Sequence, residues 1–582
     1  MKIGKLVLIG LITAVLIVIS NLLMNVTANQ SVARQHSLLS DPFLQVPTEN
    51  SVNVVWFTEF EGDRHLVRYG TQLKQQAIAN TTKLSRVRED GDSQLDNIPP
   101  QPTNRDIWRH EATVTGLSRD RRFQYRVESI QEQQTIQSNI FTLASNPTPQ
   151  KSLQILLTSN HQLMPMTAAN LQKVVETVGR VDGVFFAGDL VNIPDRASEW
   201  FDDRRGGAFF PSLQGKASYE LDNGFKTVYQ GGEIIQHAPL FTAIGNHEVM
   251  GRISEATLKK EFNQPIPRKV AQEFYQQVAS RVNPTQDPQI KQDWIKNHSF
   301  NSDTYEEIFT LPQSSSGNEL YYATTFGNIR LISLYVTNIW RSPSLEPKDS
   351  GRYKESSNDL DNPHAWGYGQ HIFEPIAKGS QQYQWLEQEL NSEAFKAAKY
   401  KIVMLHHPPH TLGGNIVPPY TDPQPIPEYQ DGELRSRYYD YPIENDYIIR
   451  DLIPLLESAG VQLVYYGHSH LWNRFKNDSG IHFLESSNVG NSYGAHLGDN
   501  PRPIPSYSPK NYVATGDPNG LEAIVPNIAP LIDGQPLPYI SSNEITVFSI
   551  FDNQTGKVSS YRYDASKPDS DVVKFDEFSL IE

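Results

Sequence analysis

Five short polar stretches, each directly after an apolar run, contain residue types that bind metal ions. They hold aspartate, asparagine and several of the chain's 16 histidines. Imidazole, carboxylate and amide oxygen together favour zinc, manganese or iron over soft metals. Two such cations about 3.5–4 Å apart can bind phosphoryl oxygens and activate a water for in-line attack. The five stretches are TSNHQ (158–162), AGDLVN (187–192), GNHE (245–248), LHHPPH (405–410) and GHSH (467–470).

Each stretch has a simpler interpretation when it is taken alone. Asp189 could cap the helix that follows it, and Asn246 could be a turn residue. His407 and His410, beside two prolines, could be surface histidines. The two histidines of GHSH, two positions apart, could point to one side of a strand. Together, however, five successive polar strand ends predict a shared metal site, because sites in open α/β sheets form beyond the carboxyl ends of strands.

The elements that must position these residues begin at Lys151. From there, apolar strands alternate with helical segments, which indicates a layered α/β domain over residues 151–565. We expect a helical insertion at about 251–318, a surface excursion rich in Pro, Gly and Asn at about 491–540, and a closing hairpin over 544–564. The expected strands cover 153–159, 183–189, 240–246, 329–336, 400–407 and 461–470, and the expected helices 166–179, 380–391 and 447–460.

Residues 40–147 have a different pattern. Short runs rich in β-formers alternate with polar turns, the longest turn running from about 81 to 105. This spacing is typical of a sandwich of the fibronectin type III kind. NPTPQ (146–150) is the expected linker to the α/β domain.

The order GD, GNHE, HxP and GHxH resembles the signature of the calcineurin-like metallophosphoesterase superfamily. The chain is most similar to its purple acid phosphatase branch, where a fibronectin-like domain also precedes the catalytic one, and GSQQYQWLEQEL (379–390) resembles a helix of that branch. The resemblance covers about residues 45–490. It implies an α/β (α+β) sandwich of two β-sheets flanked by helices, preceded by the all-β sandwich.

The resemblance also implies two metal ions that share one carboxylate, Asp189. One metal would bind Asn246, His406 and His468. The other would bind Asp189, His470 and the first-motif residue, Asn160. His247 would protonate the departing ester oxygen, as a histidine with a pKa near the working pH can do.

Two departures from the family pattern change the expected site. The first motif of the family has an aspartate where this chain has Asn160, and Gln162 is neutral as well. We therefore predict a weak first metal site beside a better second site. His161 would restore a ligand if its loop turned inward, but we expect it to face outward. Asn192 replaces the tyrosine of the coloured iron enzymes, so we expect no tyrosinate-to-iron colour.

Three functions remain open from the sequence. The first is an exported phosphohydrolase that cleaves phosphate mono- or diesters with a metal-activated water. The second is a degenerate relative that binds ligands with little or no turnover, because Asn160 weakens the first metal site. The third, ranked last, is a structural protein whose metal braces the fold, which leaves His247 unexplained. Residues expected to contact a small phosphate ester are Gln162, His407, His410 and Arg341, in a pocket built by the insertion and by the loops around 335–370.

The N-terminal segment and the composition indicate where we expect the protein to be located and which partners we expect it to bind. Residues 1–30 carry two lysines before a long apolar run, which predicts a signal peptide or an uncleaved membrane anchor and an exported protein. The net charge of −15 argues against nucleic acid as a partner. The absence of cysteine excludes disulfides, thiolate ligands and a lipid-modified cysteine.

Overall fold

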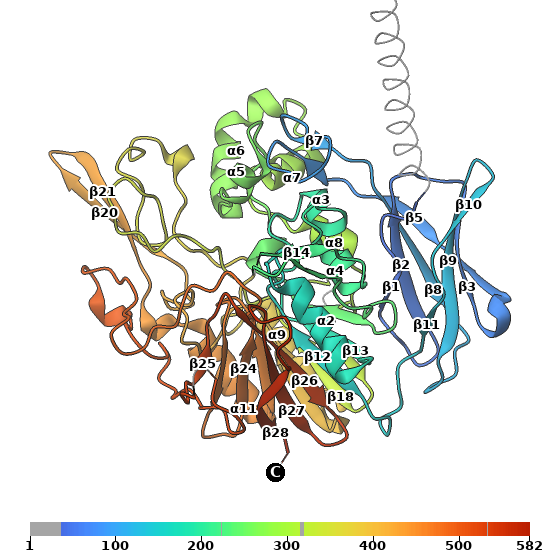
Figure 1. Cartoon of the computed structure of the whole chain (residues 1–582). Helices are drawn as coiled ribbons and strands as arrows, with labels where there is room; N and C mark the ends of the chain where they lie inside the picture. Colours follow the sequence, from blue (N-terminus) through green and yellow to red (C-terminus); the bar gives the residue numbers. More distant parts are fainter. Residues whose placement is uncertain (1–36, 223, 315–318, 532–533, 582) are drawn as a thin grey trace, which may run out of the picture.

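Two antiparallel sheets form a sandwich in the first part of the chain (Figure 1). The computed structural model describes residues 37–222, 224–314, 319–531 and 534–581, so the expected leader lies outside the described residues. Val54, Trp56, Val67 and Val127 fill the space between the two sheets. One sheet has the order β1 (Phe43–Gln45), β2 (Val52–Thr58), β8 (Trp108–Val114), β5 (Asn80–Lys83). The other has β10 (Gln134–Gln137), β9 (Phe123–Gln131), β3 (Arg64–Tyr69), β4 (Gln75–Ile78), with β11 (Phe141–Leu143) also paired to β9.

The sandwich continues into the core of the α/β part. Phe43 and Phe57 point away from the sandwich interior, and their rings lie 5.1 and 5.4 Å from that of Phe210. Leu44 N donates to Ile235 O, 3.1 Å away. Aromatic burial of this kind stabilises an interface well beyond a single hydrogen bond. The two parts of the chain therefore share a hydrophobic core.

Two larger sheets make up the α/β part. Each contains a group of neighbouring parallel strands that are largely buried on both faces, so these strands appear in the sequence as apolar runs. One sheet has the order β16 (Leu240–Thr242), β13 (Gly183–Phe186), β12 (Gln154–Thr158), β26 (Ile545–Asp552), β27 (Lys557–Asp564), β28 (Val573–Ser579). The other has β17 (Tyr322–Phe326), β18 (Ile329–Ser333), β19 (Tyr400–Met404), β22 (Leu463–Tyr466), β24 (His482–Ser486), β23 (Trp472–Lys476), β25 (Tyr539–Ile540).

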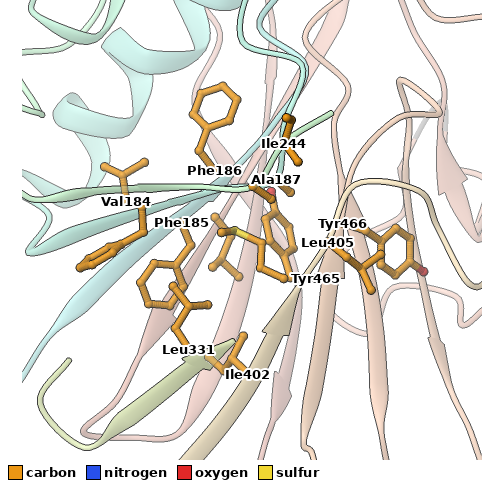
Figure 2. Close-up of a cluster of buried hydrophobic side chains, with 14 of the residues drawn as sticks. Val184, Phe185, Phe186, Ala187, Ile244, Leu331, Ile402, Leu405, Tyr465 and Tyr466 are labelled. Carbon is orange, nitrogen blue, oxygen red and sulfur yellow. The ribbon is translucent and has the colours of Figure 1, made fainter. Parts of the chain in front are cut away.

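Apolar side chains from both sheets pack together. Figure 2 shows Phe185 of β13 near Leu331 of β18 and Ile402 of β19, all fully buried. Packing at this density fixes the two sheets against each other. The helices of the described residues are α2 (Thr167–Val178), α3 (Ala197–Phe201), α4 (Phe209–Leu213), α5 (Leu258–Phe262), α6 (Arg268–Val282), α7 (Pro288–Asn297), α8 (Asp303–Ile308), α9 (Gln381–Leu390), α10 (Glu393–Ala397) and α11 (Ile453–Ala459).

The predicted fold class is confirmed, with an all-β part before a mixed α/β part. Each expected strand and helix has a counterpart, and the insertion contains α5 to α8. The expected loop at 81–105 was wrong in part, because its ends pair as the hairpin β6 (Arg88–Glu89) and β7 (Thr103–Asn104). Two further hairpins had not been expected: β14 (Tyr219–Leu221) with β15 (Thr227–Tyr229), and β20 (Gln424–Gln430) with β21 (Glu433–Asp440). Across the described part of the chain, every helix is too short or too polar to span a membrane.

Two histidines stack inside the N-terminal sandwich. The rings of His65 and His110 lie 3.5 Å apart and are nearly parallel. Hydrogen bonds join His110 to Thr58 Oγ1 at 2.8 Å and to Thr81 Oγ1 at 2.9 Å. Burial, helped by the neighbouring His65 and Arg109, lowers the pKa of His110 to about 2. Its imidazole therefore stays neutral in the folded protein under conditions that would protonate it in the unfolded chain.

We predict that acid weakens this sandwich through His110. The unfolded imidazole takes up a proton below pH ~6.5 and the folded one does not, so the free energy of unfolding falls as the pH drops from 7 to 5. One proton contributes a slope of at most about 1.4 kcal/mol per pH unit. In His110→Leu this slope should decrease, whatever its stability at pH 7, as measured by urea unfolding at several pH values. The control is His364→Gln, at an exposed histidine, and an unchanged slope in His110→Leu would contradict the assignment.

Candidate metal centre

The five polar stretches meet where the parallel strands of the two large sheets end. β12, β13 and β16 are parallel neighbours, and so are β19 and β22 in the other sheet. Their carboxyl ends therefore lie at the same edges, and the loops that follow them come together. Asp189, Asn246, His406 and His468, from four far-apart segments, are all buried at this junction.

His406 Nε2 lies among acceptor atoms. It is 3.1 Å from Asp189 Oδ2, 3.2 Å from Asn246 Oδ1 and 3.1 Å from His468 Nδ1. The other nitrogen of His406, Nδ1, lies 2.7 Å from the carbonyl oxygen of Ala187 and must donate to it. Nε2 of the neutral ring is then an acceptor as well. Carboxylate, amide oxygen and two imidazole nitrogens that converge without a donor fit a divalent cation.

The charges of these groups depend on one another. Burial disfavours the charged form of both partners, but Asp189 raises the pKa of His406, and His406 and His247 lower the pKa of Asp189. A buried carboxylate needs a positive partner, and here a proton on His406 can supply it. A metal ion at the same point would satisfy all four converging atoms at once.

Glycine precedes two of these residues because the loops touch. A Cβ on Gly188 would lie 2.8 Å from His406 Nδ1 and from Gly245 N, and one on Gly467 would lie 2.4 Å from Asn160 Oδ1. Asp189 and His468 themselves have φ of 60° and 84°, in the left-handed region that such residues seldom adopt. Strain of this kind is concentrated at functional sites, where the surrounding structure holds it in place.

The first motif does not place a free ligand at the centre. Asn160 Nδ2 and Gln162 Nε2 donate to Asp189 Oδ2 over 3.1 and 3.2 Å, and Asn160 Oδ1 accepts from His468 N at 2.8 Å. The amide oxygen of Asn160 is therefore used by the backbone. Asp189 Oδ2 thus already accepts two side-chain N–H groups.

His470 of the last motif faces the cavity, whereas His161 of the first motif faces the hydrophobic core. His470 Nδ1 bonds with Asn491 O at 2.9 Å, which leaves Nε2 for the cavity that His470 lines. His161 does not face outward as expected. It is buried, bonds with Thr158 Oγ1 at 2.9 Å and packs on Phe186, because its ring extends the hydrophobic core. It therefore offers no replacement for the missing carboxylate.

His247 is held through one ring nitrogen, and within the described residues its other nitrogen has no hydrogen bond. Its Nδ1 lies 2.7 Å from the carbonyl oxygen of Asn192, and its ring packs on Phe262 with the centroids 4.9 Å apart. Its backbone N–H donates to Asp189 Oδ1 at 3.0 Å. This arrangement directs Nε2 of His247 for proton transfer beside the converging ligands.

A cavity of about 440 Å³ opens over the centre. As expected, its wall comes partly from the insertion, through Lys259 and Phe262, and partly from the loop at Trp340. The segment 364–371 does not line it. A cavity of this size suits a small ester rather than a polymer.

The four residues predicted to contact substrate do not line this cavity. Arg341 donates to the carbonyl oxygens of Pro265, Gly367 and Gly369, and so braces the insertion against a loop. His410 bonds with Asp517 Oδ2 at 2.7 Å, and His407 is buried beside His468 with no hydrogen-bond partner. Gln162 is buried on Asp189 rather than exposed to a ligand. Substrate contact by these four residues therefore stays a prediction without support from their placement.

Two buried carboxylates that shape the loops had no assigned role in the sequence. Glu248 accepts from the N–H groups of Gly245, Asp189 and Leu190 at 2.7–2.8 Å. Its position three residues after Gly245 is capping-box spacing, which could have revealed it. Glu485 accepts from Ser469 N at 2.7 Å and so fixes the GHSH loop. It lies within a buried strand, and no sequence signal distinguishes it.

Comparison with known proteins supports the family that the motifs indicate and the fold that the structure shows. Residues 155–471 match the calcineurin-like phosphoesterase family, and residues 41–144 match the N-terminal domain of purple acid phosphatase. A solved structure of purple acid phosphatase PPD1 from yellow lupin (Lupinus luteus) seeds is similar, with a TM-score of 0.53 and 13% identity over 92% of this chain and 74% of that chain. GAP50, the anchor in the inner membrane complex of Plasmodium, has a TM-score of 0.30 and 10% identity, over 73% of this chain and 89% of that chain. No curated protein matches the sequence. The family resemblance inferred from the motifs is confirmed, and the lupin structure supports the fold.

We predict that Asn160→Asp raises the metal content of the purified protein. The new carboxylate can no longer donate to Asp189, and it adds the negative charge that a second cation requires. Metal per chain, measured by mass spectrometry after dialysis, should rise from about one ion toward the two of a dinuclear site. Asn263→Asp, which adds a charge to the cavity wall away from the ligands, should leave it unchanged. Equal metal content in wild type and Asn160→Asp would contradict our account of Asn160.

Proposed function

The chain belongs to the calcineurin-like phosphoesterase family, and we propose on that basis that it is an exported, metal-dependent phosphohydrolase of phosphate mono- or diesters. The observation that supports this most is the convergence of Asp189, Asn246, His406 and His468 beneath a cavity that His247 also lines. These four residues would hold a zinc, manganese or iron ion. When bound, such an ion neutralises phosphoryl charge and makes a bound water nucleophilic near neutral pH.

The residues of the chain supply the remaining functions. Asn192 O accepts from Nδ1–H of His247 and so fixes the ring, and Nε2 of the protonated imidazolium form can pass its proton to the oxygen of the leaving group. His470 presents Nε2 to the same cavity. Phe262 and Trp340 give the cavity apolar walls that exclude water from the ester.

A second candidate is a binding protein with little or no turnover. One observation favours it. Asn160 Nδ2 and Gln162 Nε2 donate to Asp189 Oδ2, so side-chain amides occupy a carboxylate that a dinuclear site would need for its metal ions. The placement of His247 favours the enzyme, because a binding protein has no need of a proton donor there. Turnover of p-nitrophenyl phosphate with added Mn²⁺ or Zn²⁺ tests the two candidates against each other. Metal-bound protein without turnover would support the binding protein.

We predict that chelation removes activity and lowers the melting temperature together. Without the ion, the acceptors around His406 Nε2 lose their shared partner, and that destabilises the loops that carry them. Activity and melting temperature should recover when metal is restored, as measured by p-nitrophenyl phosphate turnover and by differential scanning fluorimetry. Full activity in protein shown by mass spectrometry to be free of metal would overturn the proposal.

We also predict that His247→Ala slows esters unequally. A poor leaving group needs the proton and a good one does not, so alkyl phosphates should lose about 100-fold in kcat and p-nitrophenyl phosphate much less. His364→Ala, at an exposed histidine outside the cavity, is the matched control. Equal losses for all esters would exclude His247 as the proton donor.

A further inference from the structure

Helix α5 brings a lysine into the cavity wall. Lys259 and Phe262 of α5 both line the cavity, together with the ligand residues Asp189 and His468. Lys259 is exposed, and its ammonium group makes no ion pair or hydrogen bond with any part of the chain that the structure describes. Its three N–H donors are therefore available to a ligand.

The other charged side chains of the cavity wall are already committed. Arg196 donates to Glu199 at 2.9 Å and to Asp90 at 3.0 Å. Asp92 lies 4.0 Å from the same guanidinium, and Asp189 is enclosed by its own partners. Within the described cavity wall, Lys259 is thus the one lysine or arginine whose charge is not paired with a carboxylate.

The position of Lys259 is fixed by contacts on both sides of it. Asp90 Oδ2 accepts from Leu258 N at 2.7 Å, and Glu261 pairs with Arg88 at 2.6 Å. Asp90 and Arg88 belong to the β6–β7 region of the N-terminal part, and Figure 1 shows β7 next to the helices of the insertion. A five-residue helix would not be stable by itself, but these buried contacts hold it in place. The backbone that carries Lys259 therefore has a defined location, although the side chain itself is exposed.

We propose that Lys259 binds an anionic group carried by the leaving group, so that the preferred substrates are small phosphate esters with a second negative charge. This inference rests on the proposed function of the same centre. The reacting phosphoryl group belongs beside His247, and Lys259 lines the same cavity, so it is available to the rest of a bound ester. A lysine acts as a compact point charge and does not distinguish carboxylate from phosphoryl oxygen by its shape. In a protein with a net charge of −15, such a cation also offsets the general repulsion of anions.

The experiment compares two aryl esters of similar size, one of which carries a second negative charge. The cavity has aromatic walls at Phe262 and Trp340, so aryl leaving groups suit it. 4-Carboxyphenyl phosphate carries the second charge, and 4-carbamoylphenyl phosphate is its neutral counterpart of similar size. In wild type, kcat/KM should favour the carboxylate about tenfold, in line with a hydrogen bond to a charged group. 4-(Phosphonomethyl)phenyl phosphate then shows whether a phosphoryl-type anion is favoured over a carboxylate.

Three variants decide the role of the lysine. Lys259→Ala should abolish the preference, mainly through KM for the charged ester, and Lys259→Glu should reverse it. Lys260→Ala is the matched control, because Lys260 is the exposed neighbour on the same helix and does not line the cavity. An unchanged preference in Lys259→Ala, or no preference in wild type, would overturn the inference.

Failure of the inference can be separated from failure of the proposed function. If wild type hydrolyses both esters equally well, the phosphohydrolase stands and the role of Lys259 is excluded. If wild type hydrolyses neither ester, the proposed function fails, and calorimetric binding of 4-carboxyphenyl phosphate to wild type and Lys259→Ala decides the inference alone. Weaker binding to the variant supports it, and equal binding overturns it.

Discussion

The buried carboxylate of Asp189 is the group around which the rest of the centre is arranged. Only 1% of the surface of Asp189 is exposed, and its negative charge must be compensated by its surroundings, because transfer of a charge from water into a protein interior is costly. The chain meets this requirement with the His247 N–H, the amides of Asn160 and Gln162, and His406. These groups come from separate strand ends, so the carboxylate holds together loops that the two sheets alone bring only into proximity.

The N-terminal sandwich takes part in the same construction. Asp90 binds Arg196, Arg196 binds Glu199, and Glu199 accepts from Asn192 N at 2.8 Å. Asn192 O in turn holds the ring of His247. A continuous series of charged and hydrogen-bonded groups thus connects the β6–β7 region to the proposed proton donor. The N-terminal part therefore helps to position His247, and it also packs against the α/β part.

The exchange of a carboxylate for an amide at Asn160 changes what the centre can hold. An aspartate would repel Asp189 unless a cation lay between them. The asparagine instead donates to Asp189, so the pair is stable with fewer positive charges nearby. We therefore propose that the site around His406 is the stronger of the two metal positions that the family pattern implies.

The sequence by itself determined the succession of strands and helices along the chain, the family and the residues that converge, because strand ends and motif spacing are local properties. The order of parallel strands then made it necessary that Asp189, Asn246, His406 and His468 meet. Only the tertiary structure decided which way the polar side chains turn. The amide of Asn160 points to Asp189 because His468 N, more than 300 residues away in the chain, occupies its oxygen. Arg341 is directed away from the cavity by carbonyl oxygens of the insertion, and Lys259 reaches the cavity because Asp90 and Arg88 anchor its helix. Such directions depend on partners that are distant in sequence, and no periodicity or spacing encodes them.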